Sequence, residues 1–395
     1  MRVCFVSPQI PSGAYGRRGY SFLRVLAESN HEITLHCLED SGPCPDARAE
    51  LAELGIDIRP ATASKVARWS SCLVGLLGPT PLRVLHCESK QLHRNLVDDL
   101  SSSEYDVLHF DRFRTAPYAQ EARSFFSGPI VIDFPDCLSL YYERALENPR
   151  RGFLGWVDRR EARVIPPYEN QLLRAGYHYL VCSDVDRSRL LDVGPEAKIE
   201  VIPHRIDTVE FAPRDSDEPR EPRLVFTGTL YYLPNIDALQ WLQREIIPLV
   251  RSCFDPIDVI GFGATRELDS VQTDTRFDFR GYVENMADHL FQNDIYLCPL
   301  RIGAGLRNKL LEAFASGMAV ISTTLGYEGI NCKPGYHLLV ADTPEEFVAA
   351  IDRLLEDGEE RQRLGQNARD LVCSEYSQEA FASNVERYYC GLVGT

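Results

Sequence analysis

Short apolar runs alternate with longer segments of helical periodicity along the whole chain. The runs are nearly continuous and rich in β-branched residues, which is typical of parallel strands covered by helices on both faces. The expected strands are RVCFVSP, HEITLHCL, YDVLHF, PIVIDF, YHYLVCS and KIEVIP in the first half, and RLVFTGT, IDVIGFG, FDFRGYV, DIYLCPL and MAVIST in the second. The pattern predicts an α/β protein with doubly wound, Rossmann-like sheets.

A segment without apolar periodicity separates the two series of strands. Residues 211–223, FAPRDSDEPREPR, are rich in proline and charge, as linkers are. We therefore expect a first domain at residues 1–205, a linker at 206–222 and a second domain at 223–375, facing each other across a central cleft at the carboxyl ends of their strands. Residues 376–395 have apolar positions at helical spacing and are expected to form a helix that closes back on the first domain.

Composition and charge narrow the partners of the chain. The formal net charge is −16, so nucleic acid is not an expected partner for the surface as a whole. The twelve cysteines occur singly, no apolar run is long enough to span a membrane, and the N-terminus MRVCFVSPQIP lacks the pattern of a signal peptide. We expect a cytoplasmic protein with reduced cysteines, in which any basic cluster is local.

A glycine-containing turn in LCPLRIGAGLRNKLLEAFASG carries the clearest candidate chemistry. Gly303 and Gly305 follow an expected strand, and the next helix begins with two cations, Arg307 and Lys309. Positive side chains oppose the helix dipole at this end, so an anion is expected there, held also by the first N–H groups of the helix. The pattern favours a phosphate or diphosphate site, with Glu312 available to a ribose hydroxyl. The alternative is an ordinary strand–helix unit with a solvated basic first turn.

The turn after the first strand is a second glycine-containing segment. Gly13, Gly16 and Gly19 in SPQIPSGAYGRRGYSF have the spacing GxxGxxG, which is not the dinucleotide fingerprint and argues against an oxidoreductase. Arg18 lies within this segment. It is interpreted either as a cation that reaches a bound phosphate or as a solvated loop residue.

Polar residues also follow the strands YDVLHF and PIVIDF. His109 is expected at a strand end, projecting into the cleft and oriented by Asp111; the alternative is a core histidine with satisfied hydrogen bonds. Asp133 and Asp136 are interpreted as acceptor-binding or turn-capping residues. No group of His, Cys, Asp and Glu has the spacing of a metal site, and we predict no metal.

Residues 65–77, within KVARWSSCLVGLLGPTPLRV, combine basic, aromatic and leucine side chains. This composition fits a peripheral membrane contact that meets an apolar or lipid-linked acceptor. The alternative is a helix that packs on its own sheet.

The segment GLRNKLLEAFASGMAVISTTLGYEGI resembles the donor-site signature of glycosyltransferase family 4. KIEVIPHRIDTVEF is similar to the interdomain motif of that family, and RLVFTGTLYYLPNIDALQWL to its first C-terminal strand and helix. LVGLLGPTPLRV, VIDFPDCLSLYYER and FTGTLYYLPN further resemble the exopolysaccharide/exosortase-associated sugar transferase subgroup. The resemblance covers nearly the whole chain. It implies the GT-B fold and transfer of a sugar from a nucleotide-diphosphate sugar to an acceptor hydroxyl, with retention and without a metal or other cofactor.

The resemblance also implies roles for individual residues. Together with the residue patterns above, it leads us to expect catalysis by Arg307, Lys309 and His109, donor binding by Gly13, Thr229, Tyr282, Gly303, Gly305, Leu306 and Glu312, and acceptor-side positions for Arg18, Asp133 and Asp136. Two departures from the family stand out: Ala304 occupies the position of its first glutamate, and the segment TGTLYYLPN lacks its usual Arg and Lys. Two alternatives therefore stay open, a nucleotide-sugar epimerase of the same architecture and a non-catalytic protein that binds sugar nucleotides.

Overall fold

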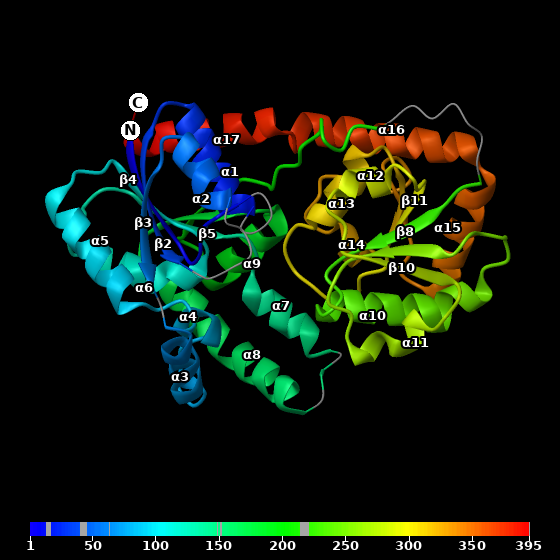
Figure 1. Cartoon of the computed structure of the whole chain (residues 1–395), viewed down its shortest axis with the longest axis horizontal. Helices are drawn as coiled ribbons and strands as arrows, with labels where there is room; N and C mark the ends of the chain where they lie inside the picture. Colours follow the sequence, from blue (N-terminus) through cyan, green and yellow to red (C-terminus); the bar gives the residue numbers. More distant parts are fainter. Residues whose placement is uncertain are drawn as a thin grey trace. The chain divides into compact units, whose positions relative to one another are not determined.

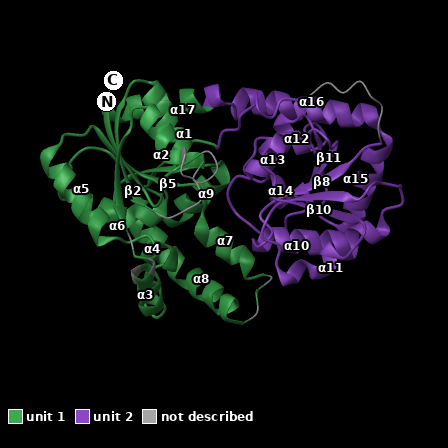
Figure 2. Ribbon diagram, in the orientation of Figure 1, with its two compact units in different colours: residues 1–203, 381–395 green, residues 204–380 purple. Residues whose placement is uncertain are grey.

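The computed structural model describes residues 1–12, 17–39, 46–62, 64–147, 149–150, 152–213 and 221–394. The chain divides into two compact units (Figure 2). Unit 1 consists of Met1–Pro203 and Phe381–Thr395, and unit 2 of His204–Ala380. Each unit contains one parallel sheet with helices on its faces. Residues 214–220 of the expected linker lie outside the described residues, and the first residues of this linker belong to unit 2.

Unit 1 has a seven-stranded parallel sheet with the order β3-β2-β1-β4-β5-β6-β7 (Figure 1). Its strands are β1 (Arg2–Ser7), β2 (Glu32–Glu39), β3 (Asp57–Thr62), β4 (Val107–Phe110), β5 (Ile130–Phe134), β6 (His178–Val181) and β7 (Lys198–Val201). Its helices are α1 (Arg17–Glu28), α2 (Asp46–Glu53), α3 (Lys65–Gly75), α4 (Leu82–Leu85), α5 (Lys90–Ser102), η1 (Phe113–Thr115), α6 (Ala116–Ala122), α7 (Leu138–Ala145), α8 (Gly152–Leu173), α9 (Asp184–Val193) and α17 (Gln378–Val393). The strand order reverses between β1 and β4.

The core of unit 1 lies in two layers, one on each face of the sheet. Successive side chains of β1 point to opposite faces, as strand geometry requires. Val3 and Phe5 pack in the layer of α1 and α17, whereas Cys4 and Val6 pack in the other layer. Every position of β4 and β5 is buried, which explains why these strands appear in the sequence as continuous apolar runs.

The C-terminal helix α17 completes the first of these layers. Phe381, Val385 and Tyr389 are buried against residues of α1 and β1. The expected closing helix is thus confirmed, although Tyr389, and not Tyr388, is its innermost tyrosine.

Unit 2 has a six-stranded parallel sheet with the order β10-β9-β8-β11-β12-β13. Its strands are β8 (Leu224–Thr227), β9 (Ile257–Ile260), β10 (Phe277–Gly281), β11 (Ile295–Cys298), β12 (Ala319–Ser322) and β13 (Leu339–Val340). Its helices are α10 (Leu233–Trp241), η2 (Leu242–Ile246), η3 (Ile247–Leu249), η4 (Arg266–Leu268), α11 (Asp269–Gln272), α12 (Met286–Leu290), α13 (Asn308–Ala315), α14 (Thr324–Tyr327), α15 (Pro344–Glu356) and α16 (Gly358–Glu375). Here the order reverses between β8 and β11.

Candidate functional site

The reversal of strand order between β8 and β11 defines a position in unit 2 where a ligand can bind. In open α/β sheets, ligands occupy the crevice outside the carboxyl ends of the strands at such a point. The glycine turn, residues 301–307, leaves the carboxyl end of β11, and α13 begins directly after it. Thr227 and Thr229 lie at the carboxyl end of β8. The predicted donor-binding residues of the two segments therefore come together at one edge of the sheet.

The glycine turn requires both of its glycines. Gly303 has a φ of 139° and Gly305 a φ of 75°, conformations that L side chains rarely adopt. A Cβ atom at Gly303 would lie 3.0 Å from Nη2 of Arg307. Arg307 is buried at the N-cap of α13 and donates to the carbonyl oxygen of Gly305, so its guanidinium folds back over the turn. Gly317, with a φ of 70°, follows the C-terminal end of this helix, in a conformation that favours glycine.

Lys309 joins the first turn of α13 to the carboxyl end of β8. Its Nζ donates to the carbonyl oxygen of Thr227 at 3.1 Å and to Oδ1 of Asn235 at 2.8 Å. The ammonium group also lies 4.4 Å from the ring centroid of Phe226, close enough for a cation–π contact. Lys309 is therefore held beside the switch point, and the alternative of a solvated basic first turn is wrong for this residue.

The surroundings of Lys309 lower its pKa to about 8. Burial is the largest cause, because it disfavours the charged form, and the positive charge of Arg307 acts in the same direction. The negative charge of Glu312 opposes these effects. A bound anion would stabilise the charged form of Lys309 and offset its repulsion with Arg307.

Asn235 is a site residue that the sequence analysis missed. Its Nδ2 donates to the carbonyl oxygen of Thr229 at 2.9 Å, while its Oδ1 accepts from Lys309. A Cβ atom at Gly228 would come within 2.5 Å of Nδ2 of Asn235, so this glycine allows the contact. A signal existed in the Pro–Asn pair of TLYYLPN, which opens α10.

Arg301, the first cation of the glycine turn, is already engaged. Its guanidinium makes two hydrogen bonds to the carboxylate of Asp237, at 2.8 and 3.0 Å, and lies 4.8 Å from the ring centroid of Trp241. Two further predicted donor residues, Leu306 and Glu312, are buried beside the turn and on α13. The cations that remain closest to the glycine turn and the end of β8 are Arg307 and Lys309.

Exposed aromatic rings follow three neighbouring strands of the same sheet. Tyr231 follows β8, Phe262 follows β9 and Tyr282 follows β10. Phe262 stacks edge-to-face with Tyr231 at 5.8 Å and with Tyr282 at 6.3 Å, measured between ring centroids. Of these three rings, Tyr282 alone was predicted from the sequence to contact the donor. Three exposed rings in contact at a strand edge form a surface suited to a flat aromatic ligand.

In unit 1, Arg18 is neither a solvated loop cation nor a residue available to a phosphate. It lies in the first turn of α1 and is buried. Its guanidinium makes two-pronged hydrogen bonds to the carboxylate of Asp133, at 2.8 to 2.9 Å, and donates to the carbonyl oxygen of Ile202 at 2.7 Å. Asp133 is itself completely buried. The expected acceptor-side roles of these two residues are corrected to a buried ion pair that ties α1 to the end of β5.

His109 does not project from the edge of the sheet. It lies inside β4, completely buried, with its ring stacked 4.3 Å from the ring of Phe5. Its Nδ1 and the hydroxyl of Tyr389 are hydrogen-bonded at 2.6 Å. Burial, and then the charge of Arg18, lowers the pKa of His109 to about 3, so the ring is neutral. The expected catalytic role is therefore corrected to a core position. The alternative of a core histidine with satisfied hydrogen bonds holds for Nδ1, whereas Nε2 is buried and has no hydrogen-bond partner among the described residues.

The remaining predicted residues of unit 1 have different outcomes. Asp111 does not orient His109 but accepts a hydrogen bond from Ser7. Asp136 is exposed after β5. Gly13 lies outside the described residues, and its predicted contact with the donor stays a prediction.

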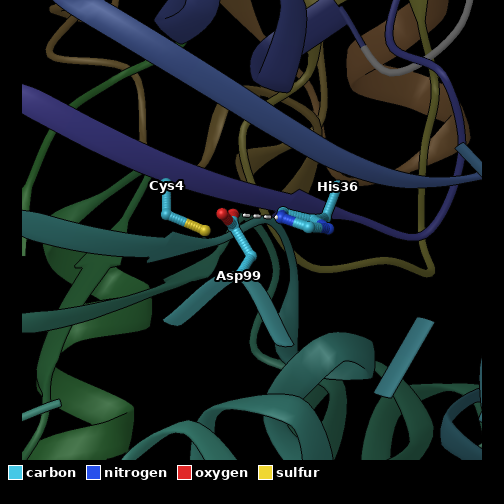
Figure 3. Close-up of side chains that lie close together, drawn as sticks. All are labelled: Cys4, His36 and Asp99. Carbon is cyan, nitrogen blue, oxygen red and sulfur yellow. Dashed lines mark hydrogen bonds and ion pairs between the residues drawn. The ribbon is translucent and has the colours of Figure 1, made fainter. Parts of the chain in front are cut away.

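Three potential metal ligands lie close together in unit 1, although they are far apart in the sequence (Figure 3). Cys4 of β1, His36 of β2 and Asp99 of α5 offer ligand atoms within 4.8 Å of one another, and all three are buried. The Asp99 carboxylate, however, already accepts from Nε2 of His36 at 2.8 Å and from the Tyr105 hydroxyl at 2.7 Å, and it forms an ion pair with Arg59. A cation would have to compete with this guanidinium, so the arrangement fits a buried ion-pair network better than a metal centre.

Two Rossmann-like units, each built on a sheet of parallel strands, are the architecture of the GT-B class of fold. In unit 2, a basic glycine turn lies at the switch point of the sheet. Solved structures of this class match nearly the full chain. They include a glycosyltransferase from Rickettsia africae (12% identity, TM-score 0.67, 99% of this chain and 98% of that chain). They also include a sucrose-phosphate synthase from Thermosynechococcus elongatus (14%, 0.71, 100% and 99%) and Anabaena HepE in complex with UDP and glucose (13%, 0.68, 99% and 100%). At these identities the likeness shows the fold.

Sequence comparisons reach part of the chain. Residues 221–357 match the family model described as glycosyl transferases group 1, so unit 2 carries the sequence pattern of that family. An uncharacterised 44.6 kDa protein in the cps region of Klebsiella pneumoniae is 23% identical over 199 residues, which are 48% of this chain and 51% of that protein. An uncharacterised glycosyltransferase of Methanocaldococcus jannaschii is 24% identical over 183 residues, 43% and 45% of the two chains. The chain thus spans about half the length of the curated relatives it matches.

Proposed function

We propose that the protein is a glycosyltransferase that transfers a sugar from a nucleotide-diphosphate sugar to an acceptor hydroxyl with retention. The observation that carries this proposal is the position of Lys309, half-buried and hydrogen-bonded beside the buried Arg307, next to a glycine turn at the switch point of unit 2. The family model over residues 221–357 supports it, as does the GT-B fold shared with structures of Anabaena HepE in complex with UDP and glucose and with UDP-glucose. We further propose membership of glycosyltransferase family 4 and a polysaccharide-related pathway, for which the cps-region relative is the support.

The parts of the donor correspond to the parts of the site. The diphosphate binds at Gly303 and Gly305, where the backbone can approach closely and the first N–H groups of α13 are near. Arg307 and Lys309 supply the charge that balances it. Glu312 accepts hydrogen bonds from the ribose, and the base stacks on the exposed rings beside Tyr282.

The chemical demand on the protein is to stabilise a leaving group. The bond between the anomeric carbon and the diphosphate oxygen breaks, and a bond from the acceptor oxygen to that carbon forms on the same face of the sugar. The acceptor proton passes to an oxygen of the departing phosphate. Negative charge develops on the diphosphate during this step, and prepositioned donors stabilise it without reorganisation. We propose that Lys309 and Arg307 provide this stabilisation, and that neither a metal nor another cofactor takes part.

We also propose that unit 1 contacts a membrane surface. Among the residues that the structure describes, no helix combines the length and the apolar content that crossing a bilayer requires. Yet α3 exposes an apolar stripe that includes Trp69, which is 66% exposed, and α8 begins with Phe153 and Trp156 exposed and stacked on each other. Arg159 and Arg163 continue the exposed stripe of α8, and such a combination of aromatic and basic side chains fits an anionic membrane surface.

The test of the proposed function begins with the donor. Uridine, guanosine, adenosine and thymidine diphosphates and their sugars are screened by thermal unfolding, because a ligand that binds the folded state alone stabilises it by about 2.7 kcal/mol at a hundredfold excess over Kd. We expect one base series to raise the Tm and Lys309→Ala to abolish the shift. No shift with any series would contradict the proposal.

Product analysis then separates the open alternatives. An epimerase converts the donor without an acceptor, whereas a transferase needs one. A non-catalytic binding protein would retain its cellular role after Arg307→Ala and Lys309→Ala, whereas the enzyme would lose turnover by on the order of a hundredfold or more.

A further inference from the structure

The sheet of unit 1 has its own reversal of strand order, between β1 and β4. The two strands end side by side there, because Oγ of Ser7 donates to Oδ2 of Asp111 at 2.8 Å and the N–H of Asp111 donates to the carbonyl of Val6. By the same rule that locates the site of unit 2, the residues that follow β4 lie where a ligand can bind. Two of these residues are the arginines Arg112 and Arg114.

Arg112 is held in a backbone conformation that is rare for a residue with a side chain. Its φ is 68° and its ψ is 149°, a region occupied almost exclusively by glycine. Thr115 holds this turn, since its N–H and its Oγ1 donate to the carbonyl oxygen of Arg112 at 3.1 and 2.9 Å. Glycine would relieve the strain. An arginine at this position indicates that its side chain has a use.

Arg114 lies half-buried in η1, close to two other guanidinium groups. It hydrogen-bonds to Cys87, a thiol and hence a weak acceptor. Helix α4, which carries Arg83, packs against η1. Burial lowers the pKa of Arg114, and the positive charges of Arg112 and Arg83 act in the same direction, whereas the charge of Asp111 opposes them.

The charges of Arg112 and Arg114 are compensated only loosely by the neighbouring carboxylate of Asp111. Nε of Arg112 is 4.0 Å from Oδ1 of Asp111, which is a long ion pair. Burial raises the pKa of Asp111, and the charge of Arg112 acts in the opposite direction. Within the described parts of the chain, no ion pair joins Arg114 to a carboxylate. In a protein with a formal net charge of −16, such a local excess of cations needs a reason.

We propose that Arg112 and Arg114 bind an anionic group, a phosphate or a carboxylate, that the acceptor carries. Guanidinium groups bind both anions with paired hydrogen bonds, and binding would relieve the repulsion within the cluster. The identification of the anion with the acceptor rests on the proposed function, in which unit 2 takes the diphosphate of the donor. The acceptor is accordingly an acidic molecule, such as a glycan phosphate or a uronic acid.

The first experiment titrates pyrophosphate, which fits either site, into four forms of the full chain by calorimetry. The wild type is expected to show two sites. Arg112→Gln/Arg114→Gln weakens one of them at least tenfold, and Lys309→Ala weakens the other. Arg174→Gln, at an exposed arginine directly after α8, is the matched control and leaves both sites unchanged.

The outcomes distinguish this inference from the proposed function. A single site that depends on Lys309 would overturn the acidic-acceptor inference and leave the donor site intact. A single site that depends on Arg112 and Arg114 would contradict the proposed function and keep the anion site. Two sites that persist in the double variant would overturn the inference.

The variant Arg112→Gly separates a loss of anion binding from a loss of folding. Because glycine adopts this backbone conformation without strain, the variant should unfold at the wild-type temperature or higher, while its affinity for pyrophosphate at this site falls at least tenfold. A variant that is stable and binds as tightly as the wild type would contradict a role for the side chain.

A last titration identifies the anion, with glucose 1-phosphate, glucuronic acid and glucose as probes in Lys309→Ala. The inference requires that one of the two acids binds at least tenfold more tightly than glucose and loses this preference in Arg112→Gln/Arg114→Gln. Equal affinity for all three probes would overturn it.

Discussion

The surroundings of Lys309 in the fold lower the pKa of its ammonium group. Its pKa of about 8 means that donor binding should respond to pH, because the protonated form is the one that attracts a diphosphate. We expect the affinity for the nucleotide diphosphate to fall as the pH rises above about 8. Isothermal titration between pH 7 and pH 10 measures this dependence.

Lys309→Arg is the matched control for this pH series. Arginine stays charged over the whole range, so the fall near pH 8 should disappear even if the overall affinity is lower. The ligand-free protein should show the linked effect on stability: between about pH 8 and 10.5 the unfolded state holds a proton that the folded state has lost, so the contribution of Lys309 to the free energy of unfolding rises with pH. A pH-independent affinity in the wild type would contradict this description of Lys309.

The Arg18–Asp133 pair makes a prediction about stability. Both side chains are almost completely buried, so Arg18→Ala would leave the Asp133 carboxylate without its partner. We expect a loss of about 3–5 kcal/mol in the free energy of unfolding, measured by urea denaturation. Arg18→Met combined with Asp133→Leu should cost less than Arg18→Ala, because neither charge is then left alone. A loss below about 1 kcal/mol in Arg18→Ala would show that the pair contributes little.

The contacts and roles of single residues are harder to infer from the sequence than the helices and strands. The glycine turn with Arg307 and Lys309 could be identified because its residues are neighbours in the chain. Asn235 reaches Lys309 from another helix, and this contact is visible only once the sheet order is known. His109 was misassigned because all residues of β4 are buried, so the apolar pattern does not show where the strand ends or which face a side chain occupies.

Among the elements, α3 and α8 carry the prediction of membrane contact. Trp69→Ser together with Trp156→Ser removes one exposed ring from each helix. Burying such a side chain contributes about 1.5–3 kcal/mol, so the double variant should bind vesicles with anionic lipid at least tenfold more weakly in a co-sedimentation assay. Phe125→Ser, at an exposed phenylalanine elsewhere in unit 1, is the control and should bind as the wild type does. Equal binding by all three proteins would exclude these helices as the contact.

Helix α17 depends on one polar contact inside its apolar face. Tyr389→Phe removes the hydroxyl bonded to Nδ1 of His109 and leaves this buried nitrogen without its partner. We expect the free energy of unfolding of unit 1 to fall by about 1–3 kcal/mol, followed by chemical denaturation. Tyr388→Phe, at the neighbouring and less buried tyrosine, should have the smaller effect. The opposite order would contradict the position of Tyr389 in the core.

The helices and strands could be predicted where the pattern of burial is the same along the whole segment. Central strands such as β1 and β8 are buried on both faces and stand out as apolar runs. The two missed strands, β3 and β13, lie at the sheet edges. β3 contains Asp57, Arg59 and Pro60 and is only partly buried, and β13 has two residues, so neither has the apolar signal of a covered strand.

At the scale of the whole molecule, the two-unit α/β architecture followed from the alternation of strands and helices and from the charged linker. The long-range contacts could not be predicted from this alternation. Cys4, His36 and Asp99 meet only because β1, β2 and α5 are neighbours in the folded unit, and no local spacing encodes this meeting (Figure 3). The division of the chain is likewise discontinuous, because α17 belongs largely to unit 1.

This discontinuity has a consequence for synthesis on the ribosome. Phe381, Val385 and Tyr389 fill part of the core of unit 1, yet they are translated after all of unit 2. Unit 2 can therefore finish folding while the earlier unit still lacks a helix and exposes the apolar surface beside Phe22. A nascent chain stalled before residue 378 should bind holdase chaperones through the segment that was made first, and should release them when the last helix emerges.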